Sequence, residues 1–348
     1  MIKDRINKNG LAIFLILLSS LMIGCEEMGN EGEEEEPIEE EEGCAFNLIT
    51  QEAPFLNREE HASVFFDGRI WVIAGQQRFS DGFSDLKNDV WSSENGEDWT
   101  LVTDDAAFEP RRNLSLIVFD NRLWVIGGSG YRPGTREPFE GLSDIWNSVD
   151  GITWEKVETN VDFITLSLQN TVVHNNRIFI LREGSGTIQE SNWYSDDGSN
   201  WTEIPINNDF PLRQGITTTS FNGRIWMIAG NGLPTGDIGG FDLIWNNVWS
   251  SADCISWVEE NSNPAFSNRT EHAVSVFDNR LWISGGRGDD GQGLKSDIWS
   301  SSDGVDWTLE CLEAFSSRHR HTMVGTNNNL YVIDGASLPI LSDVFSLQ

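Results

Sequence analysis

The sequence predicts an all-β protein, a closed β-propeller of six blades with four antiparallel strands in each blade. Three observations predict it. A unit repeats from residue 44 to residue 348 with a period near fifty residues. Each unit contains short apolar strands separated by turns rich in Asp, Asn and Gly. The last unit lacks its final strand, and a matching strand precedes the first unit.

The second strand of each unit is apolar. In four of the six copies it ends in a small residue followed by Gly. The copies are Ile70–Gly75, Leu123–Gly128, Ile178–Leu181, Ile225–Gly230, Leu281–Gly286 and Leu330–Gly335. The third copy lacks the terminal glycines, and the sixth has Asp334 before its Gly. A two-residue turn such as Asp67-Gly68 precedes each copy. These residues tolerate the positive φ of a tight hairpin, so the first two strands pair antiparallel.

The third strand opens with Asp or Asn, as in Asp89–Ser92, and leads five times into a Ser-x-Asp-Gly-x-x-Trp type of turn, as from Ser148 to Trp154. Asn95 and Cys254 are local variants of this turn. The sixth copy is missing because the chain ends first. Phe46–Thr50 matches Trp99–Thr103 position by position, so we expect it to form the outer strand of the sixth blade. Such closure leaves no open ends on the ring.

Six units with this Gly-Gly signature, each followed by an aromatic residue in the third or fourth strand, resemble the kelch repeat family over residues 44–348. The resemblance implies a β-propeller of kelch type. The Ser-x-Asp-Gly-x-x-Trp turn is also similar to the Asp-box of sialidases, another six-bladed family, although it is one residue shorter. In both families Asp holds the turn and Trp packs between blades.

Residues 1–24 are predicted to be a signal peptide, because a basic start precedes an apolar run, Leu11–Ile23, that is too short to span a bilayer. The run ends in Leu21–Cys25, which resembles the lipobox of bacterial lipoproteins, with Met22 where Leu is commonest. The resemblance implies that Cys25 carries lipid and attaches the protein to a membrane. An ordinary cleaved signal with an incidental Cys is the alternative.

Residues 25–43 are predicted to be an acidic tether, since EEMGNEGEEEEPIEEEEG repels itself and cannot bury a core. This stretch is similar to the surface-export signal of Bacteroidota lipoproteins, which implies an outer-membrane protein exposed at the cell surface. A simple solvated spacer is the alternative. Cys44, Cys254 and Cys311 remain in the propeller, an odd number, so at least one of them lacks an intramolecular partner.

Arginine is predicted to cluster at the start of the innermost strand, on the face that carries the loops between blades and the variable loops after the second strands. The series is Arg58, Arg111, Arg213, Arg269 and Arg318, with Leu166 in the third copy. Since the net charge is −32, such a ring would be a local positive island suited to carboxylates. The alternative is that these arginines pair with neighbouring blades.

Three histidines follow this series, His61, His272 and His321, and Tyr131 lies in a variable loop with Phe79, Phe83, Phe139 and Phe241. We include the histidines and Tyr131 in the candidate ligand site. The histidines lack the tight spacing of a metal site, so we expect neither metal nor cofactor. A second series, Arg69, Arg122, Arg177, Arg224 and Arg280, follows the hairpin turns on the opposite face. It is expected to pair with the turn residues Asp150, Asp197, Asp253 and Asp303.

These features favour a module that binds a protein or carbohydrate ligand and needs no catalytic residues. The acidic charge excludes nucleic acid. The kelch resemblance also leaves an enzyme of sialic-acid mutarotase type, which needs arginine and an acid such as Glu60 or Glu271. Sites of the galactose oxidase and sialidase types require tyrosines that this chain does not offer at the right places. A third reading is a purely structural spacer.

Overall fold

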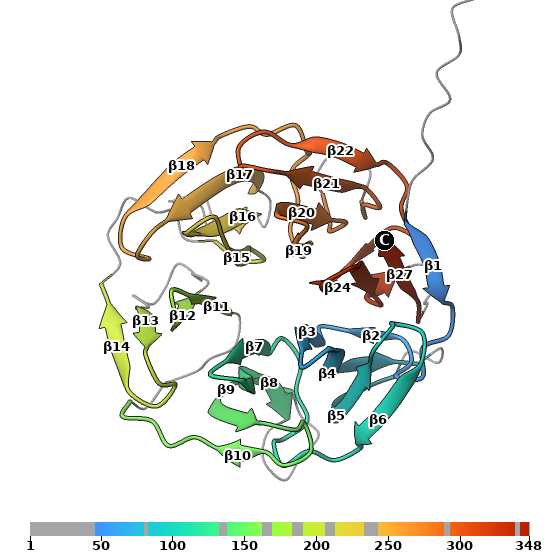
Figure 1. Cartoon of the computed structure of the whole chain (residues 1–348), viewed down its shortest axis with the longest axis vertical. Coiled ribbons are helices and arrows are strands. Elements are labelled where there is room, and N and C mark those ends of the chain that lie inside the picture. Colours follow the sequence, from blue (N-terminus) through green and yellow to red (C-terminus); the bar gives the residue numbers. More distant parts are fainter. Residues whose placement is uncertain are drawn as a thin grey trace, which may run out of the picture. The chain divides into compact units, whose positions relative to one another are not determined.

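A computed structural model confirms the all-β, six-bladed propeller with four antiparallel strands per blade. It describes residues 46–79, 83–131, 138–161, 169–182, 191–205, 213–232, 243–288, 293–337 and 342–347. Within these ranges all regular structure is β-strand, and Figure 1 shows the sheets arranged in a ring. The predicted signal peptide, Cys25, the tether and Cys44 lie outside the described residues.

The two inner strands of each blade form the hairpins expected from the turns. The innermost strands, in the order of blades one to six, are β3 (Ala62–Phe66), β7 (Ser115–Phe119), β11 (Gln169–His174), β15 (Thr217–Phe221), β19 (Ala273–Phe277) and β24 (Thr322–Gly325). The second strands are β4 (Arg69–Arg78), β8 (Arg122–Tyr131), β12 (Arg177–Arg182), β16 (Arg224–Gly232), β20 (Arg280–Ser284) and β25 (Leu330–Ile333). Asp67 has a φ of 47°, as such a turn requires.

The two outer strands complete each sheet. The third strands are β5 (Ser84–Ser93), β9 (Pro138–Ser148), β13 (Asn192–Ser195), β17 (Leu243–Ser251), β21 (Ile298–Ser301) and β27 (Val344–Leu347). The outermost strands are β6 (Trp99–Thr103), β10 (Glu155–Lys156), β14 (Trp201–Ile204), β18 (Trp257–Asn261), β22 (Thr308–Cys311) and β1 (Asn47–Thr50). Three short strands are β2 (Arg58–Glu59), β23 (Arg318–His319) and β26 (Ala336–Ser337). Strand β2 pairs with β4, and β23 pairs with β26.

The ring closes as the sequence predicts. Strand β1 pairs antiparallel with β27, with Asn47 opposite Ser346 and Leu48 opposite Phe345. The sixth blade therefore contains both ends of the propeller, in the order β1-β27-β25-β24 (Figure 1). Strand β1 supplies the backbone hydrogen bonds for the outer side of β27, so β27 is not left as an edge strand.

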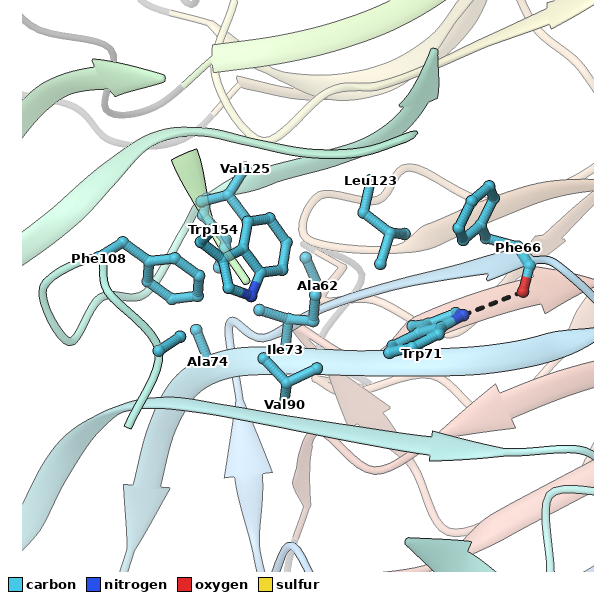
Figure 2. Close-up of a cluster of buried hydrophobic side chains, with 12 residues drawn as sticks. Ala62, Phe66, Trp71, Ile73, Ala74, Val90, Phe108, Leu123, Val125 and Trp154 are labelled. Atoms are coloured by element: carbon cyan, nitrogen blue, oxygen red, sulfur yellow. Dashed lines mark hydrogen bonds between the residues drawn. The ribbon is translucent and has the colours of Figure 1, made fainter. Parts of the chain in front are cut away.

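Apolar side chains fill the space between blades. Trp71 of β4 donates its indole N–H to the Phe66 carbonyl at 3.0 Å (Figure 2). Its ring lies against Gly151 in the turn of the next blade, where an added Cβ would sit 2.2 Å from the indole. The contact recurs between Trp124 and Gly198, Trp226 and Gly304, and Tyr331 and Gly96. This close approach explains why Gly occupies the turn.

The Asp of each such turn is used by the turn itself. Asp150 Oδ1 accepts the N–H groups of Ile152 at 2.9 Å and Thr153 at 2.8 Å. The second arginine series therefore does not pair with these aspartates, which corrects the expectation from the sequence. Its ion pairs are instead Arg69 with Glu94, Arg177 with Asp196, Arg224 with Glu260 and Arg280 with Glu310.

The cysteines of the propeller differ. Cys311 is disulfide-bonded, whereas Cys254 is a free, buried thiol. Cys254 takes the place of the turn Gly in blade four and packs in one cluster with Phe179, which replaces the usual Trp. Burial raises the pKa of the Cys254 thiol, so it is an apolar packing group rather than a nucleophile.

Candidate functional site

The arginines nominated from the sequence are buried inside the blades. Arg269 is fully buried, and its guanidinium binds the Asp297 carboxylate with Nη1–Oδ1 and Nη2–Oδ2 distances of 3.0 and 2.7 Å. Nη1 also donates to the Gly285 carbonyl at 3.0 Å. The first glycine after β20 and the Asp before β21 are thus joined by one side chain.

The same arrangement recurs around the ring. Asp89, Asp144 and Asp343 bind Arg58, Arg111 and Arg318, and the first residue of each small-residue pair offers its carbonyl to the same guanidinium. Blade four differs because Arg213 meets Asn247 Oδ1 at 2.6 Å in place of a carboxylate. Burial lowers the pKa of Arg213 to about 10, and its guanidinium lies over the Trp245 ring at 4.6 Å.

This geometry corrects the expectation that Arg58, Arg111, Arg213, Arg269 and Arg318 form a positive ring at the channel mouth. Each is at most 2% exposed, and none lines the cavity described below. A bidentate carboxylate within the blade occupies four of the five guanidinium groups. These five arginines stabilise the blades from inside. The arginines of the candidate site must therefore come from other positions.

The residue two positions after each buried arginine has a left-handed backbone. The φ values are 55° at Glu60, 51° at Asn113, 59° at Gly215, 55° at Glu271 and 57° at Arg320. In four of these residues the N–H donates to the carbonyl of the equivalent residue in the preceding blade. The bonds run from Asn113 to Glu60 at 2.9 Å, Glu60 to Arg320 at 3.2 Å, Arg320 to Glu271 at 2.9 Å and Glu271 to Gly215 at 3.3 Å.

These residues surround a cavity of about 600 Å³ where the blade links and the loops after the second strands meet. Its charged lining consists of Glu60, Glu271, Arg112, Arg287 and Arg320. The neutral polar lining includes Asn113, Asn170, Gln214, Asn231 and Thr270, and the apolar lining is Leu114, Ile216 and Ile244. The three predicted histidines, His61, His272 and His321, also line it.

A network of ion pairs crosses the cavity from blade two to blade five. Arg112 binds Glu60 at 3.0 Å, Glu60 binds Arg320 at 3.0 Å, and Arg320 binds Glu271 at 2.8 Å. His319 contacts the other oxygen of Glu271 at 2.6 Å. Arg287 is exposed at the rim and makes no ion pair with the described residues. The cavity therefore has one cation whose charge is not compensated by a described partner.

The pKa values of the two cavity carboxyls are shifted in opposite directions. Burial raises the pKa of Glu60 above its usual range, against the attraction of Arg320 and Arg112. Burial acts in the same direction on Glu271, but its bonds to His319 and Arg320 outweigh it and lower its pKa to about 2. A pair of carboxyls separated in this way can hold one acid and one base at the same pH.

The three histidines are buried and neutral. Burial lowers the pKa of His61 and of His272 to about 3, and lowers that of His321 well below its ordinary value. His61 Nε2 bonds Thr322, and His321 Nε2 bonds Ser284. Neither ring nitrogen of His272 has a hydrogen-bond partner. Both of these nitrogens are buried, so His272 is the one of the three histidines with no ring hydrogen bond among the described residues.

Tyr131 lies away from the cavity. Its hydroxyl accepts the Leu86 N–H at 3.0 Å and donates to Asp85 at 3.2 Å, so it packs its own loop against blade one. Phe79 and Phe83 are 39% and 73% exposed, whereas the side chains of Phe139 and Phe241 fall outside the described residues. The described residues contain no His, Cys, Asp and Glu cluster arranged for a metal ion, and no helix that could cross a membrane.

Comparison with known proteins is consistent with this architecture. A family profile described as the DUF6242 beta propeller domain matches residues 148–239. The chain is also similar to a solved structure entitled "Structure of YjhT", with a TM-score of 0.63 and 14% identity over 85% of this chain and 96% of that chain. No curated protein sequence matches it. The chain is therefore a six-bladed β-propeller whose candidate site is the cavity between its blades.

Proposed function

We propose that this propeller is a binding module for a carbohydrate that carries a carboxylate, held in the cavity between the blades. One observation carries the proposal: the described lining has three arginines and two glutamates, and Arg287 has no ion partner among them. Arginine binds carboxylates through two parallel N–H donors, which favours such a ligand over a neutral one.

The rest of the lining suits a sugar. Side-chain amides and a hydroxyl, among them Gln214, Asn231 and Thr270, can exchange hydrogen bonds with ligand hydroxyls. Thr270 Oγ donates to Asn231 Oδ1 at 2.9 Å, which orients that amide. Leu114, Ile216 and Ile244 offer apolar contact to the carbon face of a ring. The cavity volume of about 600 Å³ is that of a small-molecule site.

We further propose that the propeller is of kelch type and is held at the outer-membrane surface by lipid on Cys25 through the acidic tether. The repeated glycine pairs and the Leu21–Cys25 sequence support this proposal. In Cys25→Ser cells the protein should leave the membrane fraction and fail to incorporate labelled fatty acid. Retention of the label in that variant would contradict lipidation at Cys25.

Titration calorimetry with N-acetylneuraminic acid, against neutral N-acetylglucosamine, tests the binding proposal. Arg287→Ala should weaken the binding of the acidic sugar about 10- to 100-fold, since a hydrogen bond to a charged group contributes about 1.5–3 kcal/mol. Arg122→Ala is the matched control, because Arg122 contacts Asn147 away from the cavity. Equal affinity for both sugars, or no binding to either, would contradict the proposal and favour a structural spacer.

An enzyme of sialic-acid mutarotase type is the second candidate, and the opposite pKa shifts of Glu60 and Glu271 favour it. A protonated carboxyl can donate to the ring oxygen of a sugar, while an ionised one accepts the proton of the anomeric hydroxyl. The ring then opens and recloses as either anomer. NMR exchange between the anomers should accelerate with the wild type and lose that acceleration in Glu60→Gln. Tight binding without acceleration would contradict the enzyme and leave the binding module as the function.

A further inference from the structure

We propose that Glu60 is a proton-linked counter-ion of this site: an anionic ligand binds as Glu60 takes up a proton from solvent and gives up its hold on Arg112 and Arg320. This inference rests on the proposed binding of a carboxylate in the cavity. It adds how that binding is regulated, because affinity would then rise as the pH falls.

Glu60 occupies the centre of the cationic half of the cavity. Its Oε1 lies 3.0 Å from Arg320 of blade six, and its Oε2 lies 3.0 Å from Arg112 of blade two. The residue is 8% exposed. Glu60 therefore holds two of the three arginines that line the cavity, and a carboxylate that meets the third, Arg287, would share the cavity with this carboxyl.

The backbone keeps this carboxyl in place. The Glu60 N–H donates to the Arg320 carbonyl at 3.2 Å, and its carbonyl accepts the Asn113 N–H at 2.9 Å. With a φ of 55°, Glu60 is locked into the ring of bonds between blades. Protonation removes the negative charge of Glu60 without any movement of this fixed backbone.

The charged groups around Glu60 come from every blade packed against it. Arg320 and Arg112 attract its carboxylate, while the preceding residue Glu59 and Glu271 of blade five repel it. His61 and His272 are neutral at physiological pH because burial lowers their pKa values to about 3. Burial is the largest influence on Glu60 and already raises its pKa.

A bound carboxylate would shift this balance further. With Glu60 ionised, the ligand would bring a third carboxylate into the cavity that Glu60 and Glu271 already line. Neighbouring like charges favour protonation of the weaker acid. Neutral Glu60 would also turn from an acceptor into an O–H donor, which a ligand oxygen can use. Glu271 stays ionised because Arg320 and His319 lower its pKa to about 2.

Titration calorimetry of the propeller-containing chain with N-acetylneuraminate near neutral pH, in two buffers of different ionisation enthalpy, measures the proton uptake directly. We expect an uptake between zero and one proton per ligand, and a Kd that rises with pH by up to about tenfold per unit. Glu60→Gln should abolish both effects. Glu271→Gln is the matched control, and it should retain them even if its affinity changes.

The outcomes separate this inference from the function on which it rests. Absence of binding would overturn the proposed function. Binding by the wild type without proton uptake would overturn the inference alone, and this measurement needs no variant. Uptake that persists in Glu60→Gln but disappears in His319→Gln would assign the proton to His319 instead. The unfolding temperature of Glu60→Gln shows whether that variant retains the fold.

Discussion

In two of the blade links a buried arginine and a cavity arginine lie one or two residues apart, and the two make opposite kinds of contact. Arg111 is fully buried, with a bidentate bond to Asp144 and a bond to the Gly127 carbonyl. Its neighbour Arg112 lines the cavity, where it meets Glu60 and Gln76. In blade six, Arg318 is buried on Asp343, whereas Arg320 faces the two cavity glutamates.

The difference teaches that position within the repeat, and not residue type, separates structure from site. The buried position recurs because in four blades one arginine donates both to the carbonyl after the second strand and to the Asp in or just before the third strand. The next two positions differ from blade to blade. They read Glu59-Glu60, Arg112-Asn113, Gln214-Gly215, Thr270-Glu271 and His319-Arg320.

The largest effect on stability is expected from removing one of the buried arginines. Arg269→Ala should lower the free energy of unfolding by about 3–5 kcal/mol, because it leaves the Asp297 carboxylate without its partner. Denaturant unfolding measures this loss. Arg287→Ala is the control from the cavity set and should change stability by no more than about 0.5 kcal/mol. Equal stability of the two variants would remove the distinction between the sets.

A smaller effect repairs the irregular member of the buried set. Asn247 Nδ2 also donates to Glu259 Oε1 at 2.6 Å, so the substitution is made in a Glu259→Gln background, which avoids two facing carboxylates. There, Asn247→Asp should raise the free energy of unfolding by about 1–2 kcal/mol, since it places a carboxylate where Arg213 now meets an amide oxygen. Asn246→Asp is the matched control and should destabilise, because that amide donates to the Pro264 and Phe266 carbonyls. Thermal unfolding of both variants checks the prediction. A loss of stability in Asn247→Asp would show that the Asn is preferred there.

The smallest effect concerns the seam, where Asp334 occupies the place of an Ala or Gly. Its Oδ2 accepts the Arg58 N–H at 2.7 Å, and its Oδ1 has no hydrogen-bond partner. Burial raises the pKa of Asp334 well above its ordinary value, so its contribution to stability is present at acid pH and is lost as the pH rises through the folded-state pKa.

Asp334→Asn keeps an acceptor for Arg58 and removes the buried charge. We expect it to gain about 1 kcal/mol of stability at mildly alkaline pH and less at acid pH, which flattens the pH profile of unfolding. Asp343→Asn is the contrasting variant: it weakens the pair with Arg318 and should destabilise at neutral pH. A gain in Asp334→Asn that does not depend on pH would contradict the assignment to charge.

Much of the buried set was readable in the sequence. The Arg, the small-residue pair and the Asp before the third strand recur together, and the third copy lacks all three, with Leu166, Ile180-Leu181 and Asn192 at these places. This joint loss signals an interaction, since the copies of one repeat act as an internal comparison. Arginine is a common ligand-binding residue and its Asp partner lies about thirty residues further along the chain, so the repeat pattern alone does not favour the pairing over a ligand site.

The cavity arginines were harder to predict. Arg112, Arg287 and Arg320 do not recur at equivalent positions, so the repeat pattern does not identify them. Variation at two adjacent positions of an otherwise regular repeat was the available signal. Of the residues nominated from the sequence, His61, His272 and His321 line the cavity, as do Glu60 and Glu271 from the enzyme alternative.

The sequence by itself determined the blades, their strand order and the seam between β1 and β27, because strand periodicity and turn chemistry act over a few residues and the repeats show them many times. Only the tertiary structure decided which of two neighbouring side chains enters the cavity. That choice depends on a left-handed residue in each link and on hydrogen bonds between blades. The ion pair of Glu60 with Arg320, for example, joins the first blade to the last across the seam.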